Sequence, residues 1–214
     1  MHSRLFRRAV ASAVAPAAID ERWGRINDTL ATLGRTSTGT TLTPYYDTGD
    51  AYRAMWKAVD EAQRRVVWQT FIFDDDVVGK TTLRKLMAAC ERGVEVEFLY
   101  DAGGTFNGGT LTGRRRLTAE LIQAGAKVIE YRPFHRHFFR YFASGMKWRL
   151  SPGLRNHRKV LVVDDRVAFI GGLNVGDDYA AKSVGGNGRF RDTMCCVEGA
   201  EALAHMREVC VDTV

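Results

Sequence analysis

The sequence lacks any uninterrupted run of 18 apolar residues, which excludes a transmembrane helix of ordinary length. It has only four cysteines in 214 residues, with no C-x-x-C pair and no cysteine/histidine cluster at zinc spacing. We therefore expect free thiols in a reducing compartment and no metal site. Proline is also scarce, at four residues, whereas 45% hydrophobic and 26% charged residues are ordinary for a globular protein. A disordered, collagen-like or low-complexity chain is excluded.

Acidic residues are missing from the first 19 positions, which are rich in Ala and contain Arg4, Arg7 and Arg8. This composition is typical of a mitochondrial transit peptide. A weak secretory or membrane-proximal segment and a tail without a targeting role are the alternatives. Three of the six net positive charges lie in this segment, and the surplus suits an anionic partner such as nucleic acid, a membrane surface or a phosphorylated substrate.

Apolar periodicity predicts an α/β layered fold. A first helix is expected at Glu21–Leu33, followed by a linker at 35–42 and a short strand at Leu42–Tyr46. Helices at 50–64, with Asp50 as cap, 80–91 and 114–125 then alternate with strands at 65–73, 94–100 and 128–131. Two short strands at 160–163 and 167–170 flank a tight turn, and the sequence continues with a late strand at 192–197 and a helix from Ala200. Residues 134–156 are predicted to be a long irregular insertion.

Gly79-Lys80-Thr81 contains the end of a nucleotide-binding phosphate loop, but the pattern also needs a glycine where Asp74 stands. Three consecutive acids, from Asp74 to Asp76, would repel a phosphate there. We interpret this stretch as the start of a helix, where preceding carboxylates are stabilising.

The residues that indicate chemistry begin at His157-x-Lys159, followed by four residues and Asp164, and then by Gly171-Gly172-x-Asn174. Positions two apart in a strand point to the same face, so His157 and Lys159 should lie side by side. A neutral imidazole can attack phosphorus and form a phosphohistidine, while the lysine charge and the asparagine amide stabilise phosphoryl oxygens. The two glycines would let backbone N–H groups approach an oxyanion.

Asp164 stands an odd number of residues from His157, so a straight strand would place it on the opposite face. It could fix the ring, the lysine or the loop, and spacing does not choose among them. Asp177 and Asp178 are further candidates for orienting the His157 ring through the nitrogen that does not attack.

Together these residues resemble the H-x-K-x4-D motif of the phospholipase D superfamily, extended by G-[GS]-x-N. Several further blocks over residues 40–205 resemble the first half of bacterial-type cardiolipin synthases: FIFDDDVVG (71–79), FLYDAGG (98–104), VIEYRPF (128–134), RNHRK (155–159), GGLNVGDDY (171–179) and FRDTMCCVEG (190–199). The resemblance implies a mixed β-sheet flanked by helices on both faces. It also implies transfer of a phosphatidyl group to phosphatidylglycerol through a phosphohistidine, without a metal or organic cofactor.

Composition, periodicity and the resemblance together divide the chain into a transit peptide at 1–19, a helical and linker extension at 20–40 and a phospholipase D-like catalytic lobe at 41–214. Members of the family join two lobes with one motif each, whereas only one motif is present here, and the paired N-terminal hydrophobic anchors are absent. We therefore expect a second lobe, supplied by homodimerisation or by a missing C-terminal half. The alternatives to a phosphatidyltransferase are a single-motif phosphodiesterase or nuclease that acts as a homodimer, and an inactive half-enzyme.

Between Phe134 and Trp148, aromatic residues alternate with His, Arg and Lys. This mixture suits an anionic lipid surface, with rings at headgroup depth and cations against the lipid phosphates. Single-stranded nucleic acid is a less favoured ligand, and a partly buried amphipathic loop is the purely structural interpretation. With the leader, the segment predicts a protein peripheral to the mitochondrial inner membrane, or alternatively to a bacterial cytoplasmic membrane.

Overall fold

The computed structural model describes residues 21–33, 39–105, 111–148, 151, 153–200, 202–204 and 206. Two compact units divide the chain, Met1–Ser37 and Thr38–Val214. Helix α1 (Glu21–Leu33) belongs to the first unit and has the bounds that its sequence periodicity predicts. The candidate site lies in the second unit.

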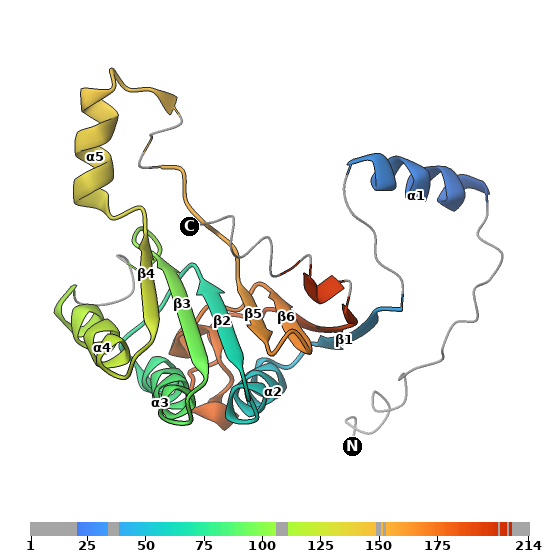
Figure 1. The fold of residues 1–214 in the computed structure, drawn as a ribbon, viewed down its shortest axis with the longest axis horizontal. Coiled ribbons are helices and arrows are strands. Elements are labelled where there is room, and N and C mark those ends of the chain that lie inside the picture. Colours follow the sequence, from blue (N-terminus) through green and yellow to red (C-terminus); the bar gives the residue numbers. More distant parts are fainter. Residues whose placement is uncertain are drawn as a thin grey trace. The chain divides into compact units, whose positions relative to one another are not determined.

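A seven-stranded mixed sheet forms the centre of the second unit, in the order β1-β7-β6-β5-β2-β3-β4 (Figure 1). Its strands are β1 (Thr41–Tyr45), β2 (Arg65–Thr70), β3 (Glu95–Asp101), β4 (Lys127–Tyr131), β5 (Val160–Val163), β6 (Val167–Gly171) and β7 (Met194–Glu198). The neighbours β2, β3 and β4 are parallel, and every other pair is antiparallel. The parallel part is the part in which helices alternate with strands along the chain, as βαβ units require.

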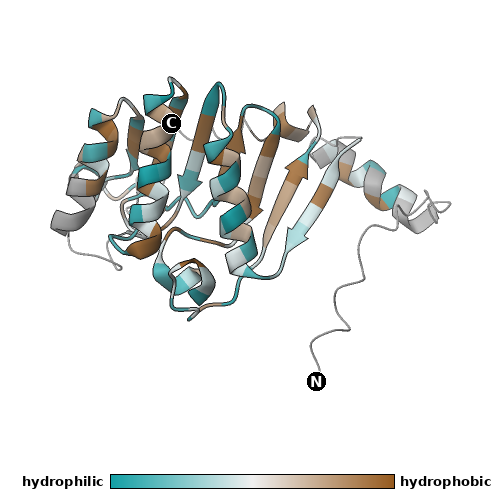
Figure 2. Ribbon diagram, turned by 90° about the horizontal axis from the view of Figure 1, so that it is seen from below, coloured by the Kyte–Doolittle hydropathy of each residue, from teal (hydrophilic) through white to brown (hydrophobic). Residues whose placement is uncertain are grey.

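Helices α2 (Thr48–Asp60), α3 (Val77–Glu91) and α4 (Leu111–Gln123) pack against one face of the sheet. The main core lies there and includes Tyr52, Leu86, Phe98 and Leu161. In Figure 2 the strands carry long hydrophobic stretches, whereas these helices alternate between hydrophilic and hydrophobic residues, as amphipathic helices do. On the other face a smaller cluster joins β5, β6 and β7 to helical residues between Ala200 and Met206. The prediction of a sheet with helices on both faces is confirmed.

The residues that cap helices α2 and α3 can be compared with the sequence-based expectation. The cap of α2 is Asp47, whose carboxylate accepts a hydrogen bond from the backbone N–H of Asp50, so Asp50 lies in the first turn and the predicted cap is wrong. Asp76 caps α3 by accepting from the Gly79 N–H at 2.8 Å, which agrees with the interpretation of the acidic stretch as a helix start. A Cβ at Gly79 would overlap the Asp74 carbonyl oxygen, so this glycine serves close packing.

The insertion predicted to be irregular instead begins with helix α5 (Phe134–Ala143), which follows directly on β4 and extends beyond the sheet (Figure 1). Phe138 and Phe142 lie four residues apart and therefore share one helix face. After α5 the chain turns at Ser144–Met146, where Gly145 and Met146 have positive φ, and returns to β5. Two short 3-10 helices, η2 (Asp177–Tyr179) and η3 (Lys182–Val184), lie in the segment between β6 and β7.

Candidate active site

The predicted catalytic segment lies at one edge of the sheet. The strand register pairs Gln69 near the end of β2 with Val160 at the start of β5, and it pairs Gly171 at the end of β6 with Met194 at the start of β7. Because β3 runs parallel to β2, its carboxyl end reaches the same edge. Ligands of open α/β sheets bind outside such carboxyl ends. His157 and Lys159 enter β5 from this edge.

His157 and Lys159 precede β5 in an extended segment and meet at the ring of Phe71, which follows β2. The His157 ring is exposed, and its centroid lies 4.5 Å from the Phe71 centroid. Lys159 is only 4% exposed, and its Nζ lies 5.2 Å from the same centroid. That Nζ also donates a hydrogen bond to the His157 carbonyl at 2.9 Å. The structure thus brings the imidazole and the ammonium to one aromatic ring.

Electrostatics favour a neutral imidazole beside a cation. Burial lowers the pKa of His157 and the Lys159 ammonium lowers it further, whereas Asp101 acts in the opposite direction. Burial also lowers the pKa of Lys159 to about 8, against the opposing charge of Asp192. Near neutral pH the histidine is therefore uncharged, as nucleophilic attack requires, while most of the lysine remains charged.

Asp101 holds the backbone that leads to His157. Its fully buried carboxylate accepts from the N–H of Gly103 at 2.6 Å through Oδ1 and from the N–H of Asn156 at 2.8 Å through Oδ2. The Arg155 guanidinium also donates to Oδ1 at 3.3 Å. Sequence reasoning did not select Asp101, although an acid that ends an apolar strand and precedes two glycines was a usable signal.

Asn174 lies on the other side of the same segment. Its buried side chain accepts from the backbone N–H of Ile72 at 3.0 Å through Oδ1, and the Tyr52 hydroxyl donates to the backbone carbonyl oxygen of Asn174. Burial raises the pKa of Tyr179, whereas hydrogen bonding from the Asn174 side chain acts in the opposite direction. The Phe71–Ile72 segment therefore connects Asn174 to the ring contact that holds His157 and Lys159.

Gly171 and Gly172 do not offer free N–H groups to an oxyanion, contrary to the expectation. Gly171 N–H donates to the Lys159 carbonyl at 3.4 Å, and Gly172 N–H donates to the Thr193 carbonyl at 3.1 Å. A Cβ at Gly171 would overlap the Thr193 carbonyl oxygen, and one at Gly172 would overlap the Asp192 carboxylate. The glycines thus make room for the start of β7 and bring Asp192, which sequence reasoning missed, toward the Lys159 ammonium.

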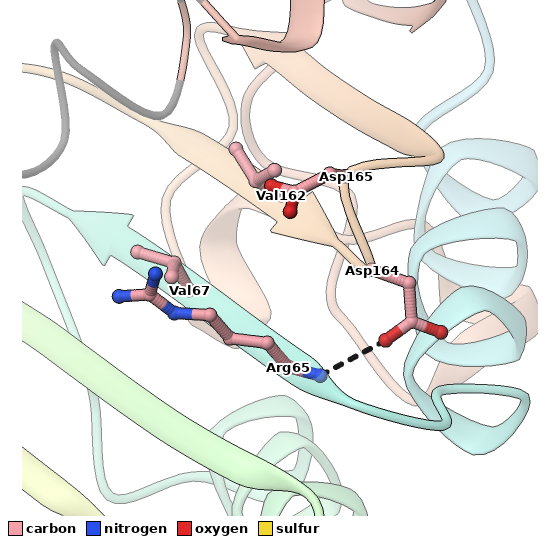
Figure 3. A pocket seen from close by; sticks show the side chains of 5 residues that line it. All are labelled: Arg65, Val67, Val162, Asp164 and Asp165. Atoms are coloured by element: carbon pink, nitrogen blue, oxygen red, sulfur yellow. Dashed lines mark hydrogen bonds between the residues drawn. The ribbon is translucent and has the colours of Figure 1, made fainter. Parts of the chain in front are cut away.

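Asp164 lies at the far end of β5 from His157, in the turn to β6. Its carboxylate accepts from the backbone N–H groups of Gln63, Arg64 and Arg65 at 2.8 to 2.9 Å, and Figure 3 shows it turned toward the start of β2. Burial would raise the pKa of Asp164, but these hydrogen bonds outweigh burial and the pKa is lowered. The sequence spacing left three roles open for Asp164: fixing the His157 ring, the lysine or a loop. Its contacts fit the third role, because they hold the β5–β6 turn against the start of β2.

Asp177 and Asp178 have partners away from His157. The Asp177 carboxylate accepts from the backbone N–H of Val78 at 2.8 Å, at the start of α3. The Asp178 carboxylate accepts from the Asn187 side chain at 2.6 Å and pairs with Arg189 at 3.2 Å. These contacts hold the loop after β6, so the geometry does not support an orienting role at the His157 ring.

In the described part of the chain, no group of three or more His, Cys, Asp or Glu side chains is arranged to hold a metal ion. Cys90, Cys195 and Cys196 are free thiols. None of the helices that the structure describes is both long enough and apolar enough to cross a membrane.

Residues 55–209 match the family described as "Cardiolipin synthase, PLD-like domain". The chain is 30% identical over 150 residues to the probable cardiolipin synthase YwiE of Bacillus subtilis, covering 70% of this chain and 27% of that protein. It is 39% identical over 128 residues to cardiolipin synthase B of Shigella flexneri, covering 60% of this chain and 28% of that protein. Both relatives are bacterial and lend no support to a mitochondrial location. The transit-like leader lies outside the described residues.

Two solved structures share the fold. Nuc from Salmonella typhimurium, a phospholipase D family member, has a TM-score of 0.57 at 16% identity, with 81% of this chain and 93% of that chain covered. NucT from Helicobacter pylori has a TM-score of 0.55 at 14% identity, with 81% and 95% covered. The chain thus spans less than a third of the two cardiolipin synthases but nearly the full length of these two solved structures.

Proposed function

Since this chain belongs to the phospholipase D-like family of cardiolipin synthases, we propose that it is one lobe of a phosphatidyltransferase that moves a phosphatidyl group to a hydroxyl of phosphatidylglycerol. The observation that carries the proposal is the pairing of an exposed, neutral His157 with the buried Lys159 cation on the Phe71 ring. A nucleophile and a fixed positive charge at one sheet edge are what attack on a phosphodiester requires.

In the proposed first step, an imidazole nitrogen of His157 forms a bond to phosphorus, and the bond from phosphorus to the leaving alcohol breaks. A general acid protonates that alcohol. A phosphatidylglycerol hydroxyl then attacks the phosphohistidine, loses its proton to the same group and releases His157. Lys159 offsets the negative charge on the phosphoryl oxygens, and the Asn174 amide supplies a donor. Asp164 acts in this scheme through the turn that it stabilises, away from the reacting atoms.

The proposed general acid is the histidine of a second phospholipase D-like lobe, because His157 is bonded to phosphorus in this step and has no proton to give to the leaving alcohol. The chain spans 27% to 28% of the two cardiolipin synthases compared above, so in those proteins further chain is present beyond the matched part. A second copy of this chain or a further segment would complete the site. We also propose a location at the surface of a membrane that contains anionic phospholipid; the bacterial relatives favour a bacterial cytoplasmic membrane over the mitochondrial one.

A second candidate is hydrolysis of a phosphodiester by a homodimer. One observation favours it: the match covers 93% of the phospholipase D family member from Salmonella typhimurium, so one lobe like this one accounts for nearly all of that chain. The same histidine would form the covalent intermediate, and water would replace the lipid hydroxyl as the acceptor.

The test is incubation of purified chain with phosphatidylglycerol vesicles, with cardiolipin measured by mass spectrometry. We expect cardiolipin formation in the wild type and its loss in His157→Ala by at least roughly a thousandfold, since the nucleophile is removed. Lys159→Met should lose a comparable amount. Lys57→Ala, which alters an exposed lysine paired with Glu61 on α2, is the matched control and should keep full activity.

Wild type denatured with detergent during turnover, at neutral to mildly alkaline pH where a nitrogen–phosphorus bond survives, should also carry a phosphatidyl group on His157, found by peptide mass spectrometry. Unchanged turnover in His157→Ala contradicts the proposal. Cleavage of single-stranded DNA without lipid turnover favours the second candidate, and turnover of neither substrate favours an inactive half-enzyme.

A further inference from the structure

Helix α5 and the turn after it expose a large aromatic surface. Phe138, Phe139 and Phe142 are 54%, 75% and 55% exposed, and Met146 and Trp148 are 59% and 72% exposed. We call these four aromatic side chains, together with Met146, the aromatic patch. The rings of Phe138 and Phe142 lie 4.9 Å apart, so the patch is partly continuous, and none of its members belongs to either described core cluster. An exposed patch of this kind marks an interaction site more often than chance.

The charges around the patch all have one sign. Residues 131–163 contain eight Lys or Arg residues and no Asp or Glu. Arg136, Arg140 and Lys147 are exposed beside the patch. On α5, the two arginines lie on the side of the helix opposite Phe138 and Phe142. A helix with a strongly apolar face and a cationic face is the pattern of an element that lies in the interface of an anionic bilayer.

The dimensions and chemistry favour a bilayer over nucleic acid. Ten helical residues span about 15 Å, which is half the hydrocarbon thickness, so α5 can lie in the interface but cannot cross it. Phe139, Phe142 and Met146 are purely apolar and gain most from leaving water. A single-stranded nucleic acid can bind the cations and stack bases on the exposed rings, but it gives Met146 no comparable apolar surroundings.

The base of α5 is tied to the candidate active site. The Arg132 guanidinium, just before α5, donates to the carbonyl oxygens of Ser151 and Leu154. Arg155 donates to the Arg132 carbonyl at 2.9 Å and also reaches the Asp101 carboxylate. Since Asp101 also binds the backbone N–H of Asn156, one network joins the start of α5 to the residue before His157.

We propose that the aromatic patch inserts at headgroup depth into a bilayer containing anionic phospholipid, and that the Arg132–Arg155–Asp101 network holds the His157 edge near that surface. This inference deepens the proposed function, because it assigns the lipid surface to a specific element. The binding step itself needs no catalysis and can be measured separately.

The experiment is flotation of the full chain with vesicles of phosphatidylcholine alone and with one quarter phosphatidylglycerol. We expect binding to the anionic vesicles and a decrease of at least tenfold in Phe139→Ser/Phe142→Ser. Arg136→Gln/Arg140→Gln should bind both vesicle types equally weakly. Tyr46→Ser, which alters a side chain that is 78% exposed outside α5, is the matched control and should bind as the wild type does. Circular dichroism checks that each variant is folded.

Two further measurements separate this inference from the proposed function. His157→Ala should bind vesicles as the wild type does, because binding does not need the nucleophile. If the wild type binds vesicles without turning over lipid, the proposed function is contradicted and the membrane-binding inference is not. The Phe139→Ser/Phe142→Ser variant should keep wild-type turnover of dispersed short-chain phosphatidylglycerol and lose turnover of vesicles. Equal vesicle binding by this variant and the wild type overturns the inference, as does tighter binding of single-stranded DNA than of anionic vesicles.

Discussion

Lys159 brings a buried positive charge to the candidate site. Its ammonium is removed from water, and it is close enough to His157 to lower the pKa of the imidazole. A cation in such surroundings gains more from a phosphate oxygen than a hydrated surface lysine does, because little water remains to be displaced. Burial also lowers the pKa of Lys159 to about 8, so its charge is present at neutral pH and is lost in mild alkali.

Asp74 provides a test of electrostatics outside the catalytic segment. Burial raises the pKa of its carboxyl to about 7, and the charges of Asp76, Asp178 and Asp177 add to the effect. Between pH 4 and 7 the folded chain therefore holds a proton that the unfolded chain has lost, and stability falls as the pH rises through this range. At pH 8 we expect Asp74→Asn to be more stable than the wild type by about 2 kcal/mol, since partial exposure reduces the full effect of the shift.

Urea unfolding at pH 5 and pH 8 measures this difference. The gain from Asp74→Asn should shrink strongly at pH 5, because the wild-type carboxyl is then protonated. Asp60→Asn, in an exposed pair with Lys85, is the control and should show a similar small effect at both values. An equal gain for Asp74→Asn at both pH values contradicts the argument.

Among the elements, the β5–β6 hairpin depends on Asp164 for its connection to β2. Asp164 has a φ of 55°, a left-handed conformation that Asp and Asn tolerate better than Ala. Asp164→Ala removes three charge-assisted hydrogen bonds and should lower the free energy of unfolding by about 3 kcal/mol. Asp164→Asn keeps the turn and part of the hydrogen bonding and should lose about half as much. Denaturant titration measures both.

The next turn residue supplies the control for this prediction. Asp165 has a φ of 53° and a long ion pair with Arg64 at 3.9 Å, so Asp165→Asn should change stability by less than about 1 kcal/mol. Because the pKa of Asp164 is lowered, its stabilisation is present above pH 4 and is lost as the pH falls further. If Asp164→Ala unfolds at the same denaturant concentration as the wild type, the three hydrogen bonds make no net contribution to stability and the prediction is wrong.

Periodicity predicted most of the elements because most of them bury one face. The alternation from Arg65 to Tyr131 and the hairpin after Val160 are of this kind. Helix α5 was missed because its aromatic face meets no core, so the rule that links apolar spacing to burial gives no guidance there. The cap of α2 was misplaced because Asp47 and Asp50 are both good capping residues, and only the chain direction before the helix selects Asp47.

Some residues of the candidate site can be predicted from local sequence, whereas others depend on contacts between distant parts of the chain. His157, Lys159 and Asn174 follow from a motif within 18 residues. Asp101 and the backbone it binds at Asn156 are 55 residues apart and meet because β5 and β3 are both neighbours of β2, which local spacing cannot show. The role of Gly171 and Gly172 was misjudged for a related reason: whether their N–H groups are free depends on the position of β7.

At the scale of the whole molecule, the proposed reaction requires two lobes, and mixing variants tests whether two copies supply them. If two copies share one site, a tenfold excess of His157→Ala should lower the activity of a fixed amount of wild type about tenfold, because most wild-type subunits then have a defective partner. Vesicle turnover after subunit exchange measures this. The same excess of bovine serum albumin is the control for crowding. Unchanged activity contradicts homodimerisation and leaves a further segment as the source of the second lobe.

The pairing of β1 with β7 has a consequence for how the chain reaches its native state. Thr41 and Glu198 are partners in the sheet, yet 157 positions separate them along the sequence. Strand β1 emerges from the ribosome first and waits for its partner for on the order of ten to thirty seconds at ordinary rates of synthesis. Closing so long a loop is entropically costly, so this pair should form late. During that interval β1 lacks its partner in the sheet, and Pro44 in β1 limits premature pairing with other strands.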